Sequence, residues 1–250
     1  MPEVVHGDVR IRFSVQGEGP PLLLHHGAAS NRTTWLRHGY ARALRERYRL
    51  ILIDARGHGQ SDKPLAPEAH SLPVRVGDVT AVLDALDVRR AHFLGYSMGG
   101  FIGFGMARLA QERLLSLAIG GAHPFADPAF ARLDASHGRD ADSFLRGMDL
   151  VVGEPMDRET QALLVQNDWA AVMTSLAQRV SLEEVVSQID VPCWLFAGTA
   201  DRRYELIERA QRAIPRAELL SLPGLGHLRT FESAERILPG LSAFLAASSA

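Results

Sequence analysis

The chain of 250 residues contains little cysteine, no long hydrophobic run and almost no net charge. Its one cysteine, Cys193, excludes an intrachain disulfide, and its place in the apolar run of residues 193–197 predicts an inert, buried thiol. No apolar stretch reaches the roughly 18 residues that a membrane-spanning helix needs, and residues 1–6 lack the basic and apolar parts of a secretion signal. These absences predict a cytoplasmic protein that enters no membrane.

An excess of charge of one sign is also absent, since 27 basic residues face 29 acidic ones for a net charge of −2. No basic run is interleaved with aromatic residues, so no nucleic-acid partner is expected. The ten histidines form neither a His-Glu-x-x-His nor a His-x-His pattern, and we expect no metal site. Residues 56–61 carry glycines and charged side chains but no nucleotide-binding pattern, so they are interpreted as a structural turn and no cofactor is expected.

Short apolar runs alternate along the chain with patterns typical of helices. With 46% hydrophobic residues, the chain can bury one sizeable core, and the alternation predicts a parallel sheet covered by helices on both faces. The predicted strands cover residues 9–16, 21–24, 49–53, 91–94, 114–119, 191–197 and 217–222. The predicted helices of the core cover residues 34–47, 71–86, 101–109, 204–213 and 233–246.

Residues 122–189 interrupt this alternation, because they show helical patterns without strands. They predict a helical cap inserted between the two parts of the core, residues 1–121 and 190–250. Within the cap, residues 156–179 are typical of one or two amphipathic helices, and Ser-Leu-Glu-Glu at residues 181–184 fits a capping box that opens another helix.

A serine lies at the corner between a predicted strand and a predicted helix. The apolar run of residues 91–94 ends at a Gly-x-Ser-x-Gly pattern over residues 95–99, and a helical pattern begins at Phe101. The glycines permit a tight turn around Ser97, and the helix N-terminus offers unpaired N–H groups toward developing negative charge. Taken alone, the same pattern also describes a glycine-rich turn before a buried helix.

A carboxylate and a histidine follow two later strands. The carboxyl ends of parallel strands meet at one edge of a sheet, so residues just after different strands converge there. Asp201 follows the strand that ends at Ala197, and His227 follows the strand that ends at Leu222. We therefore predict that His227 accepts the proton of Ser97 and that Asp201 orients the imidazole and stabilises its charged form. Each residue also has a simpler interpretation when it is considered alone: Asp201 as a residue at the start of a helix, and His227 as a histidine in a loop.

The segment after the strand that follows the serine offers an alternative carboxylate. Asp127 lies six residues beyond the glycine pair 120–121, and it is the second candidate for the acid. His123 has no evident carboxylate partner nearby in sequence and is predicted to line the substrate pocket. The backbone N–H groups of Ala28 and Met98 are predicted to bind the oxyanion of an acyl-transfer reaction.

Together these segments resemble the α/β-hydrolase superfamily over essentially the whole chain. The matching pieces are His-Gly-Ala at residues 26–28, Asp-Ala-Arg-Gly-His-Gly-Gln-Ser at 54–61, Gly-Tyr-Ser-Met-Gly-Gly at 95–100, and Asp201 with His227. The resemblance implies an α/β fold with an eight-stranded, mostly parallel sheet and a helical cap after the sixth strand. His25 departs from the pattern, which has an apolar residue before a single His-Gly, and its role is not predicted.

The predicted function is a serine hydrolase that cleaves a small carboxylic ester or lactone, its small-molecule partner, through an acyl-enzyme. Within the superfamily, the segment of residues 54–61 resembles small bacterial esterases and enol-lactonases. It also resembles carbon–carbon bond hydrolases and perhydrolase or haloperoxidase relatives, which are alternatives with the same three residues. A carbon–carbon hydrolase would need polar cap groups to hold a second carboxylate, and the candidates are Arg132, Arg139, Arg146 and Arg158. A non-catalytic ligand receptor on the same fold is a further alternative. The serine argues against haloalkane dehalogenase and epoxide hydrolase chemistry, which this fold runs with an aspartate.

An apolar acyl pocket is predicted under the cap. Its candidate residues, each of which also fits a plain core position, are Trp35, His123, Phe125, Phe144, Met148, Trp169 and Met173. No single side chain distinguishes an ester from a lactone, a short acyl chain from a long one, or a monomer from a homodimer.

Overall fold

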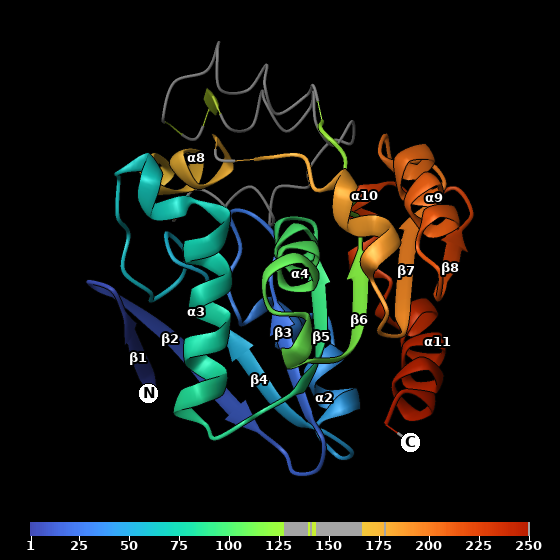
Figure 1. Ribbon diagram of the computed structural model, residues 1–250, viewed down its shortest axis with the longest axis horizontal. Helices are drawn as coiled ribbons and strands as arrows, with labels where there is room; N and C mark the ends of the chain where they lie inside the picture. Colours follow the sequence, from blue (N-terminus) through green and yellow to red (C-terminus); the bar gives the residue numbers. More distant parts are fainter. Residues whose placement is uncertain (128–139, 141, 144–166, 178, 250) are drawn as a thin grey trace.

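An eight-stranded sheet runs through the centre of the computed structural model, which describes residues 1–127, 140, 142–143, 167–177 and 179–249 (Figure 1). The strands are β1 (Glu3–His6), β2 (Val9–Gln16), β3 (Pro21–His25), β4 (Arg49–Ile53), β5 (Ala91–Tyr96), β6 (Leu114–Gly120), β7 (Cys193–Gly198) and β8 (Ala217–Leu222). Their order in space is β1-β2-β4-β3-β5-β6-β7-β8. Strands β3 to β8 pair in parallel, whereas β2 pairs antiparallel with both β1 and β4. The predicted mostly parallel sheet is confirmed.

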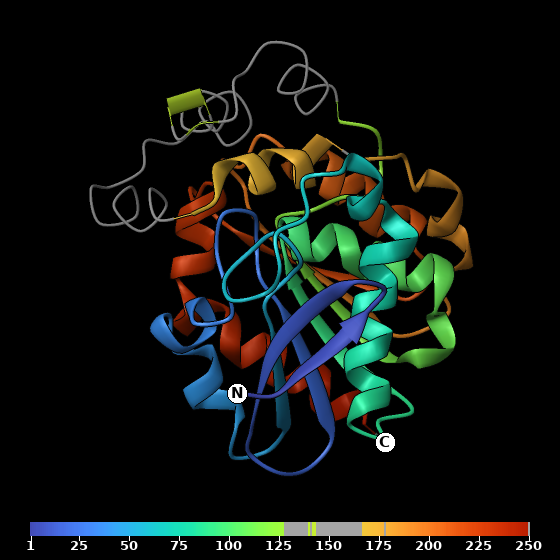
Figure 2. The same cartoon turned by 90° about the vertical axis from the view of Figure 1, so that its left-hand side faces the viewer.

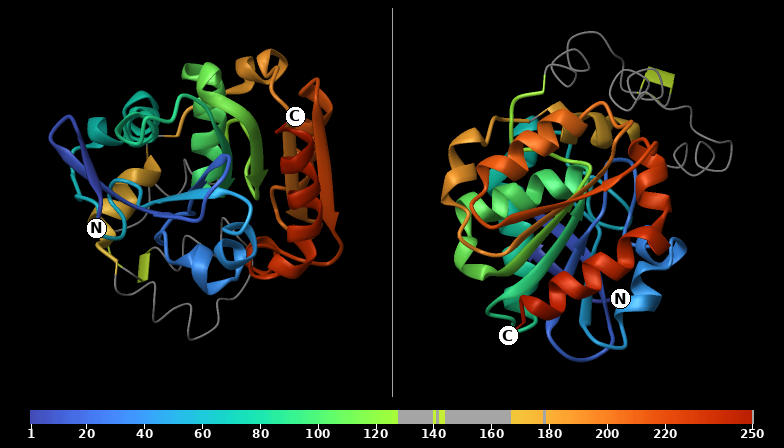
Figure 3. Two further views of the ribbon diagram at one scale, coloured as in Figure 1. Left: turned by 90° about the horizontal axis from the view of Figure 1, so that it is seen from below. Right: turned by 90° about the vertical axis from the view of Figure 1, so that its right-hand side faces the viewer.

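Helices cover both faces of the sheet, as the views in Figures 1 and 3 show. The helices are α1 (Thr34–Arg37), α2 (Tyr40–Leu44), α3 (Leu72–Ala85), α4 (Met98–Leu109), α8 (Trp169–Ala177), α9 (Tyr204–Ala213), α10 (His227–Glu232) and α11 (Ala234–Ala247). Short 3₁₀ turns span Pro67–His70, Gln111–Arg113 and Glu183–Gln188. Helices α3, α4 and α9 pack on one face, and α1, α2, α10 and α11 pack on the other.

Side chains of the central strands alternate between the two faces, and both faces are buried. Leu23 of β3 packs in the cluster with α3 and α4, while its neighbours Leu22 and Leu24 pack in the cluster with α2 and α11. The same alternation holds in β4 and β5. Because neither face meets water, these strands consist of apolar residues without polar alternation, which is the pattern that identified them in the sequence.

The structure differs from the predicted elements at several places. Residues 34–47 form α1 and α2 instead of one helix, because Gly39 between them has a φ of 84° that interrupts the helical backbone. Strand β1 was not predicted, since its residues alternate between exposed and half-buried positions and carry no apolar run. The predicted capping box forms a 3₁₀ turn, in which the Glu183 N–H donates to Ser181 Oγ at 3.4 Å. Pro192 follows closely and disfavours a longer helix before β7.

Most of the predicted cap, residues 122–189, lies outside the described residues, and its boundaries stay a prediction. The described part includes α8, which lies at the carboxyl end of the sheet above the start of α3 (Figures 1 and 2). Arg75 of α3 holds α8 through a hydrogen bond from Nη1 to the Ser175 carbonyl at 3.1 Å, and burial lowers the pKa of this guanidinium to about 10. Within the described ranges, no helix is long and apolar enough to cross a bilayer.

The lone cysteine lies in the sheet as predicted. Cys193 is the first residue of β7, is fully buried, and carries no disulfide. Burial raises the pKa of its thiol to about 12, which keeps the thiol protonated and unreactive at neutral pH.

A buried ion pair joins the loop after β4 to α3. Arg56 donates to both carboxylate oxygens of Asp78 at 2.5 Å and to the Ala69 carbonyl at 2.6 Å. His6 of β1 lies 2.8 Å from the same carboxylate, so this one acid connects the sheet edge, the loop and the helix. Both charged side chains are almost fully buried, at 3% and 4% exposure.

We expect Asp78→Ala to lower the free energy of unfolding by about 3–5 kcal/mol, because it leaves the buried Arg56 guanidinium without its counter-ion. Urea denaturation followed by circular dichroism measures this loss. The control is Glu208→Ala, which breaks the exposed i,i+4 pair with Arg212 and is expected to cost no more than about 1 kcal/mol. Equal losses in the two variants would contradict the prediction.

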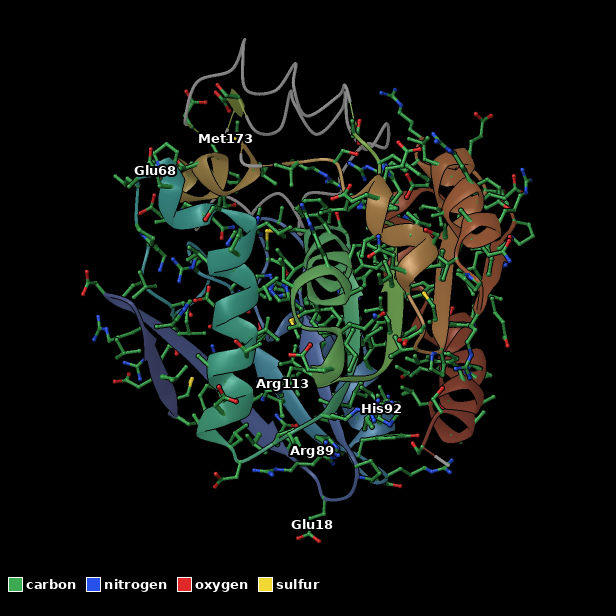
Figure 4. The ribbon with its side chains drawn as sticks, viewed as in Figure 1. Glu18, Glu68, Arg89, His92, Arg113 and Met173 are labelled. Atoms are coloured by element: carbon green, nitrogen blue, oxygen red, sulfur yellow. The ribbon has the colours of Figure 1, made fainter. Side chains whose placement is uncertain are left out.

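We expect His92 of β5 to make folding sensitive to acid, because its imidazole is buried. Its ring nitrogens lie 2.7 Å from Ser116 Oγ and 2.9 Å from Ser249 Oγ, and burial lowers its pKa to about 4. In Figure 4 it lies at the opposite end of the molecule from Met173 of α8. Between about pH 6.5 and the folded pKa, the unfolded chain binds a proton on this histidine that the folded chain does not.

The contribution of His92 to stability is therefore lost as the pH falls below about 6.5, by up to about 1.4 kcal/mol per pH unit. We expect His92→Gln to have a shallower decline of the free energy of unfolding between pH 7 and pH 5 than the wild type. Urea titrations at fixed pH values test this, with His38→Gln as the control histidine. A decline as steep in His92→Gln as in the wild type would show that His92 does not titrate as stated.

Candidate active site

Ser97 occupies a strained turn between β5 and α4. Its backbone has φ 54° and ψ −110°, a left-handed conformation that costs a residue with a side chain of order 1–3 kcal/mol. The Ser97 N–H donates to the Gly120 carbonyl at the end of β6, at 2.8 Å. The turn directs the serine away from the strand, and the surrounding packing maintains it.

Two glycines let neighbouring backbone segments touch at this turn. A Cβ atom at Gly99 would lie 2.1 Å from the carbonyl oxygen of His25, and one at Gly95 would lie 2.4 Å from the carbonyl oxygen of Gly99. Both distances are shorter than any van der Waals contact, so only glycine fits. The start of α4 thereby rests directly against the end of β3.

The structure brings Ser97, His227 and Asp201 together in one hydrogen-bonded chain. His227 Nε2 lies 3.0 Å from Ser97 Oγ, and His227 Nδ1 lies 2.7 Å from Asp201 Oδ2. The carboxylate accepts the Nδ1–H, so Nε2 is left as the acceptor that faces the serine hydroxyl. The three residues follow β5, β7 and β8, and they meet at the carboxyl end of the sheet, as the order of the strands predicted.

The imidazole and its carboxylate are held from several sides. Tyr96 donates its hydroxyl to the His227 carbonyl at 2.5 Å, and the Arg203 N–H donates to Asp201 Oδ1 at 3.0 Å. Burial by itself raises the pKa of Asp201, but the neighbouring His227 and Arg203 outweigh it and hold this pKa below its ordinary value. Asp201 is therefore ionised at neutral pH and can stabilise an imidazolium.

The loop after β3 lies against the serine. A Cβ atom at Gly27 would lie 3.5 Å from Ser97 Cβ, so the residue that precedes Ala28 lies beside the turn. Asn167 donates to the Ala29 carbonyl at 2.8 Å and holds this loop from above. Met98 is the first residue of α4, so its N–H has no acceptor within the helix. The role of the Ala28 and Met98 N–H groups as oxyanion donors stays a prediction.

Two histidines build the scaffold of this loop. His26 donates its Nδ1–H to the Gly27 carbonyl at 2.7 Å and accepts the Ala55 N–H on Nε2 at 3.0 Å, which fixes its tautomer. His25 donates its Nδ1–H to the His26 carbonyl at 3.2 Å. Both rings are buried, and burial lowers the pKa of each, so they are neutral structural groups. Sequence reasoning could not find these hydrogen bonds, because the partners of both histidines are backbone atoms.

Residues 56–61, interpreted from the sequence as a structural turn, are held by the carboxylate and carbonyl of Asp54. The Asp54 carboxylate accepts the Arg32 N–H at 2.7 Å and the Gln60 N–H at 2.9 Å, and it also pairs with the Arg32 guanidinium. Ser61 donates its hydroxyl to the Asp54 carbonyl at 2.7 Å. These bonds use the carboxylate entirely within the turn and the adjacent loop.

The alternative acid, Asp127, forms an ion pair with Arg203, whereas the carboxylate bonded to His227 is that of Asp201. Arg203 Nε donates to Asp127 Oδ2 at 3.3 Å. His123 Nε2 lies 3.6 Å from the same oxygen, so the expectation that His123 lacks a carboxylate partner nearby in sequence was wrong. Sequence reasoning did not identify Arg203 as a site residue, since Arg202 and Arg203 fit the polar start of a helix.

The predicted pocket residues lie in different places. Phe125 is buried and stacks on the ring of His123, and Trp169 and Met173 belong to α8 at the carboxyl end of the sheet (Figure 4). Trp35 is fully buried between Tyr40 and Phe231 in the core cluster on the α2 and α11 face. The other predicted polar and apolar cap residues lie outside the described residues; they are Arg132, Arg139, Phe144, Arg146, Met148 and Arg158.

The arrangement supplies the groups that acyl transfer needs. A hydroxyl faces a neutral imidazole nitrogen, a buried carboxylate supports the imidazole, and the helix N-terminus and a loop flank the serine. Among the residues that the structure describes, no group of three His, Cys, Asp or Glu side chains is placed to hold a metal ion.

Comparison with known proteins gives consistent similarities. The sequence profile of the alpha/beta hydrolase fold family matches residues 20–149. An uncharacterized protein of Mycobacterium tuberculosis is 34% identical over 145 residues, covering 57% of this chain and 41% of that protein. A pimeloyl-(acyl-carrier protein) methyl ester esterase of Aeromonas hydrophila is 40% identical over 109 residues, covering 43% of this chain and 40% of that protein. This chain therefore matches only about two fifths of the length of either relative.

The overall fold is also that of a solved structure. The crystal structure of a hydrolase from Pseudomonas aeruginosa superposes with a TM-score of 0.83 at 27% identity. The superposition covers 98% of this chain and 97% of that one.

We expect His26→Phe to lower both stability and the reactivity of Ser97. The change leaves the Gly27 carbonyl and the Ala55 N–H without partners, at a cost of about 1–3 kcal/mol each, and frees the loop beside the serine. Urea denaturation measures the first effect, and the labelling rate with a fluorophosphonate probe measures the second. His38→Phe is the control, and unchanged labelling in His26→Phe would contradict the stated role of His26.

Proposed function

Because this chain belongs to the alpha/beta hydrolase fold family, we propose that it is a serine hydrolase that cleaves a small carboxylic ester or lactone. The observation that carries the proposal is the hydrogen-bonded chain from Ser97 through His227 to Asp201. A lactone is a cyclic ester, so both substrates present the same acyl carbon to the serine. The Aeromonas hydrophila relative, by its name an esterase of a methyl ester, supports the ester class.

In the first half of the proposed reaction, Ser97 Oγ attacks the carbonyl carbon while His227 Nε2 takes the hydroxyl proton. The carbonyl oxygen becomes an oxyanion, which the N–H groups of Ala28 and Met98 bind. Asp201 stabilises the imidazolium and keeps its ring oriented. His227 then gives the proton to the leaving oxygen, and the carbon–oxygen bond to the alcohol breaks.

In the second half, water replaces the alcohol. His227 takes a proton from the water, the hydroxide attacks the acyl carbon, and the carboxylic acid leaves as Ser97 regains its proton. The same groups serve both halves, because acylation and deacylation each require a base to activate an oxygen nucleophile and an acid to protonate the leaving oxygen.

The serine also favours acyl transfer over displacement at an alkyl carbon. An alkyl halide would leave the serine as an ether, which a histidine-activated water does not cleave, whereas an acylated serine is an ester and turns over. Haloalkane chemistry therefore does not fit Ser97.

We expect Ser97→Ala to lower kcat/KM for p-nitrophenyl acetate and butyrate by about 10³-fold or more, since it removes the nucleophile. The wild type should also show an acyl group on Ser97 by intact-protein mass after rapid quenching. Ser181→Ala, which changes an exposed serine, is the matched control. A panel of lactones followed by acid release assigns the preferred ring or chain. Equal ester turnover by the wild type and Ser97→Ala would reject the proposal.

A further inference from the structure

A guanidinium lies beside the imidazole of His227. Arg203 Nη1 is 3.4 Å from His227 Nδ1, and the arginine side chain is only 5% exposed. In the tautomer that presents Nε2 to Ser97, Nδ1 carries a proton that it donates to Asp201. Two donors therefore face one another, and Arg203 acts on the ring through its charge and not through a hydrogen bond.

A positive charge at this place opposes the proposed chemistry. His227 must become an imidazolium when it takes the proton of Ser97, and a nearby cation disfavours that form. Burial strengthens the effect, because few water molecules screen charges in this region. Without a second negative charge nearby, the Asp201 carboxylate would have to offset the positive charges of both the imidazolium and the Arg203 guanidinium.

Asp127 supplies a second negative charge against the same guanidinium. Its Oδ2 accepts the Arg203 Nε–H at 3.3 Å, and its side chain is 9% exposed. Asp127 follows β6 and Arg203 follows β7, so the pair spans two neighbouring strand ends beside the site.

We infer that Arg203 and Asp127 are a buried pair of positioning residues that sets the proton affinity of His227, with Asp127 offsetting the charge that Arg203 brings to the ring. Arg203 also fixes Asp201 through its backbone N–H, a bond that survives any change of its side chain. The catalytic part of this inference rests on the proposed function, because it assumes that His227 is the base.

The other ionisable groups around the pair are few in the described ranges. His123 Nε2 lies 3.6 Å from Asp127 Oδ2. Burial lowers the pKa of this imidazole, and the charges of Arg179 and Arg203 add to the effect, although the Asp127 carboxylate opposes it. Arg179 follows α8 and interacts electrostatically with both Arg203 and Asp127. Against His227 itself lie Ser97 and the Tyr96 hydroxyl, which bonds its carbonyl.

The test is a pH titration of the His227 ring in two variants, one that removes the negative charge of Asp127 and one that removes the positive charge of Arg203. The ring is monitored by ¹⁵N NMR of histidine-labelled protein, and its signal is assigned by its loss in His227→Gln. We expect Asp127→Asn, which removes the negative charge of Asp127 beside the guanidinium, to lower the midpoint by about one pH unit. Arg203→Met, which removes the cation, should raise it. The double variant should return toward the wild type, and Arg203→Lys should stay nearer the wild type than Arg203→Met.

Kinetics give the consequence for turnover. Asp127→Asn should move the acid limb of kcat/KM to lower pH and reduce its plateau about tenfold, the equivalent of one pH unit in imidazolium stability. Arg202→Met and Asp190→Asn make the same chemical changes at neighbouring or exposed positions and should leave both readouts unchanged.

The inference is overturned if the midpoints of Asp127→Asn and Arg203→Met shift in the same direction or do not shift. A pair with a purely structural role would not produce shifts in opposite directions. If Arg203→Met does not fold, the downward shift in the isosteric Asp127→Asn decides alone. The titration needs no substrate. Absence of ester turnover in the wild type would therefore reject the proposed function while the NMR result still decides the electrostatic role of the pair.

Discussion

The left-handed backbone at Ser97 is the constraint on which the rest of the site depends. A serine does not hold φ 54° by its own preference, so the neighbouring segments must enforce it. They do so by contact, since Gly99 lies against the His25 carbonyl and the Ser97 N–H is bonded to the end of β6. The ends of β3, β5 and β6 are therefore fixed relative to one another by the same turn that presents the hydroxyl. The distance from the serine to the loop at residues 26–28 follows from this packing.

In the part of the chain that the structure describes, four carboxylates of the interior have basic partners. A buried carboxylate without a counter-charge would cost several kcal/mol. The pairs are Asp54 with Arg32, Asp78 with Arg56, Asp127 with Arg203, and Asp201 with His227. In three pairs the partner is an arginine, whose charge does not change at any working pH. The fourth partner is an imidazole whose other nitrogen faces Ser97 Oγ, so the proposed proton transfer between the serine and the ring takes place at this pair.

Much of the fold followed from the sequence because buried parallel strands are apolar on both faces and need no alternation. The meeting of Ser97, Asp201 and His227 was predictable for a related reason, since strand order places the ends of β5, β7 and β8 at one edge. Strand β1 and helix α10 were not predicted, because neither has an apolar run of its own. The contacts of His26 were beyond sequence reasoning too, since its partners are the backbone atoms of a loop whose path depends on the finished fold.

The choice between Asp201 and Asp127 shows what sequence spacing leaves open. Both carboxylates follow neighbouring strands, β6 and β7, and either position could lie near the imidazole. What separates them is the arginine between them, because the Arg203 side chain binds Asp127 while its backbone N–H binds Asp201. A carboxylate bound to a fixed cation has little charge left for a transient imidazolium, whereas one bound to a neutral N–H keeps its charge available. Under the proposed function, one arginine thus distinguishes the roles of two chemically identical groups.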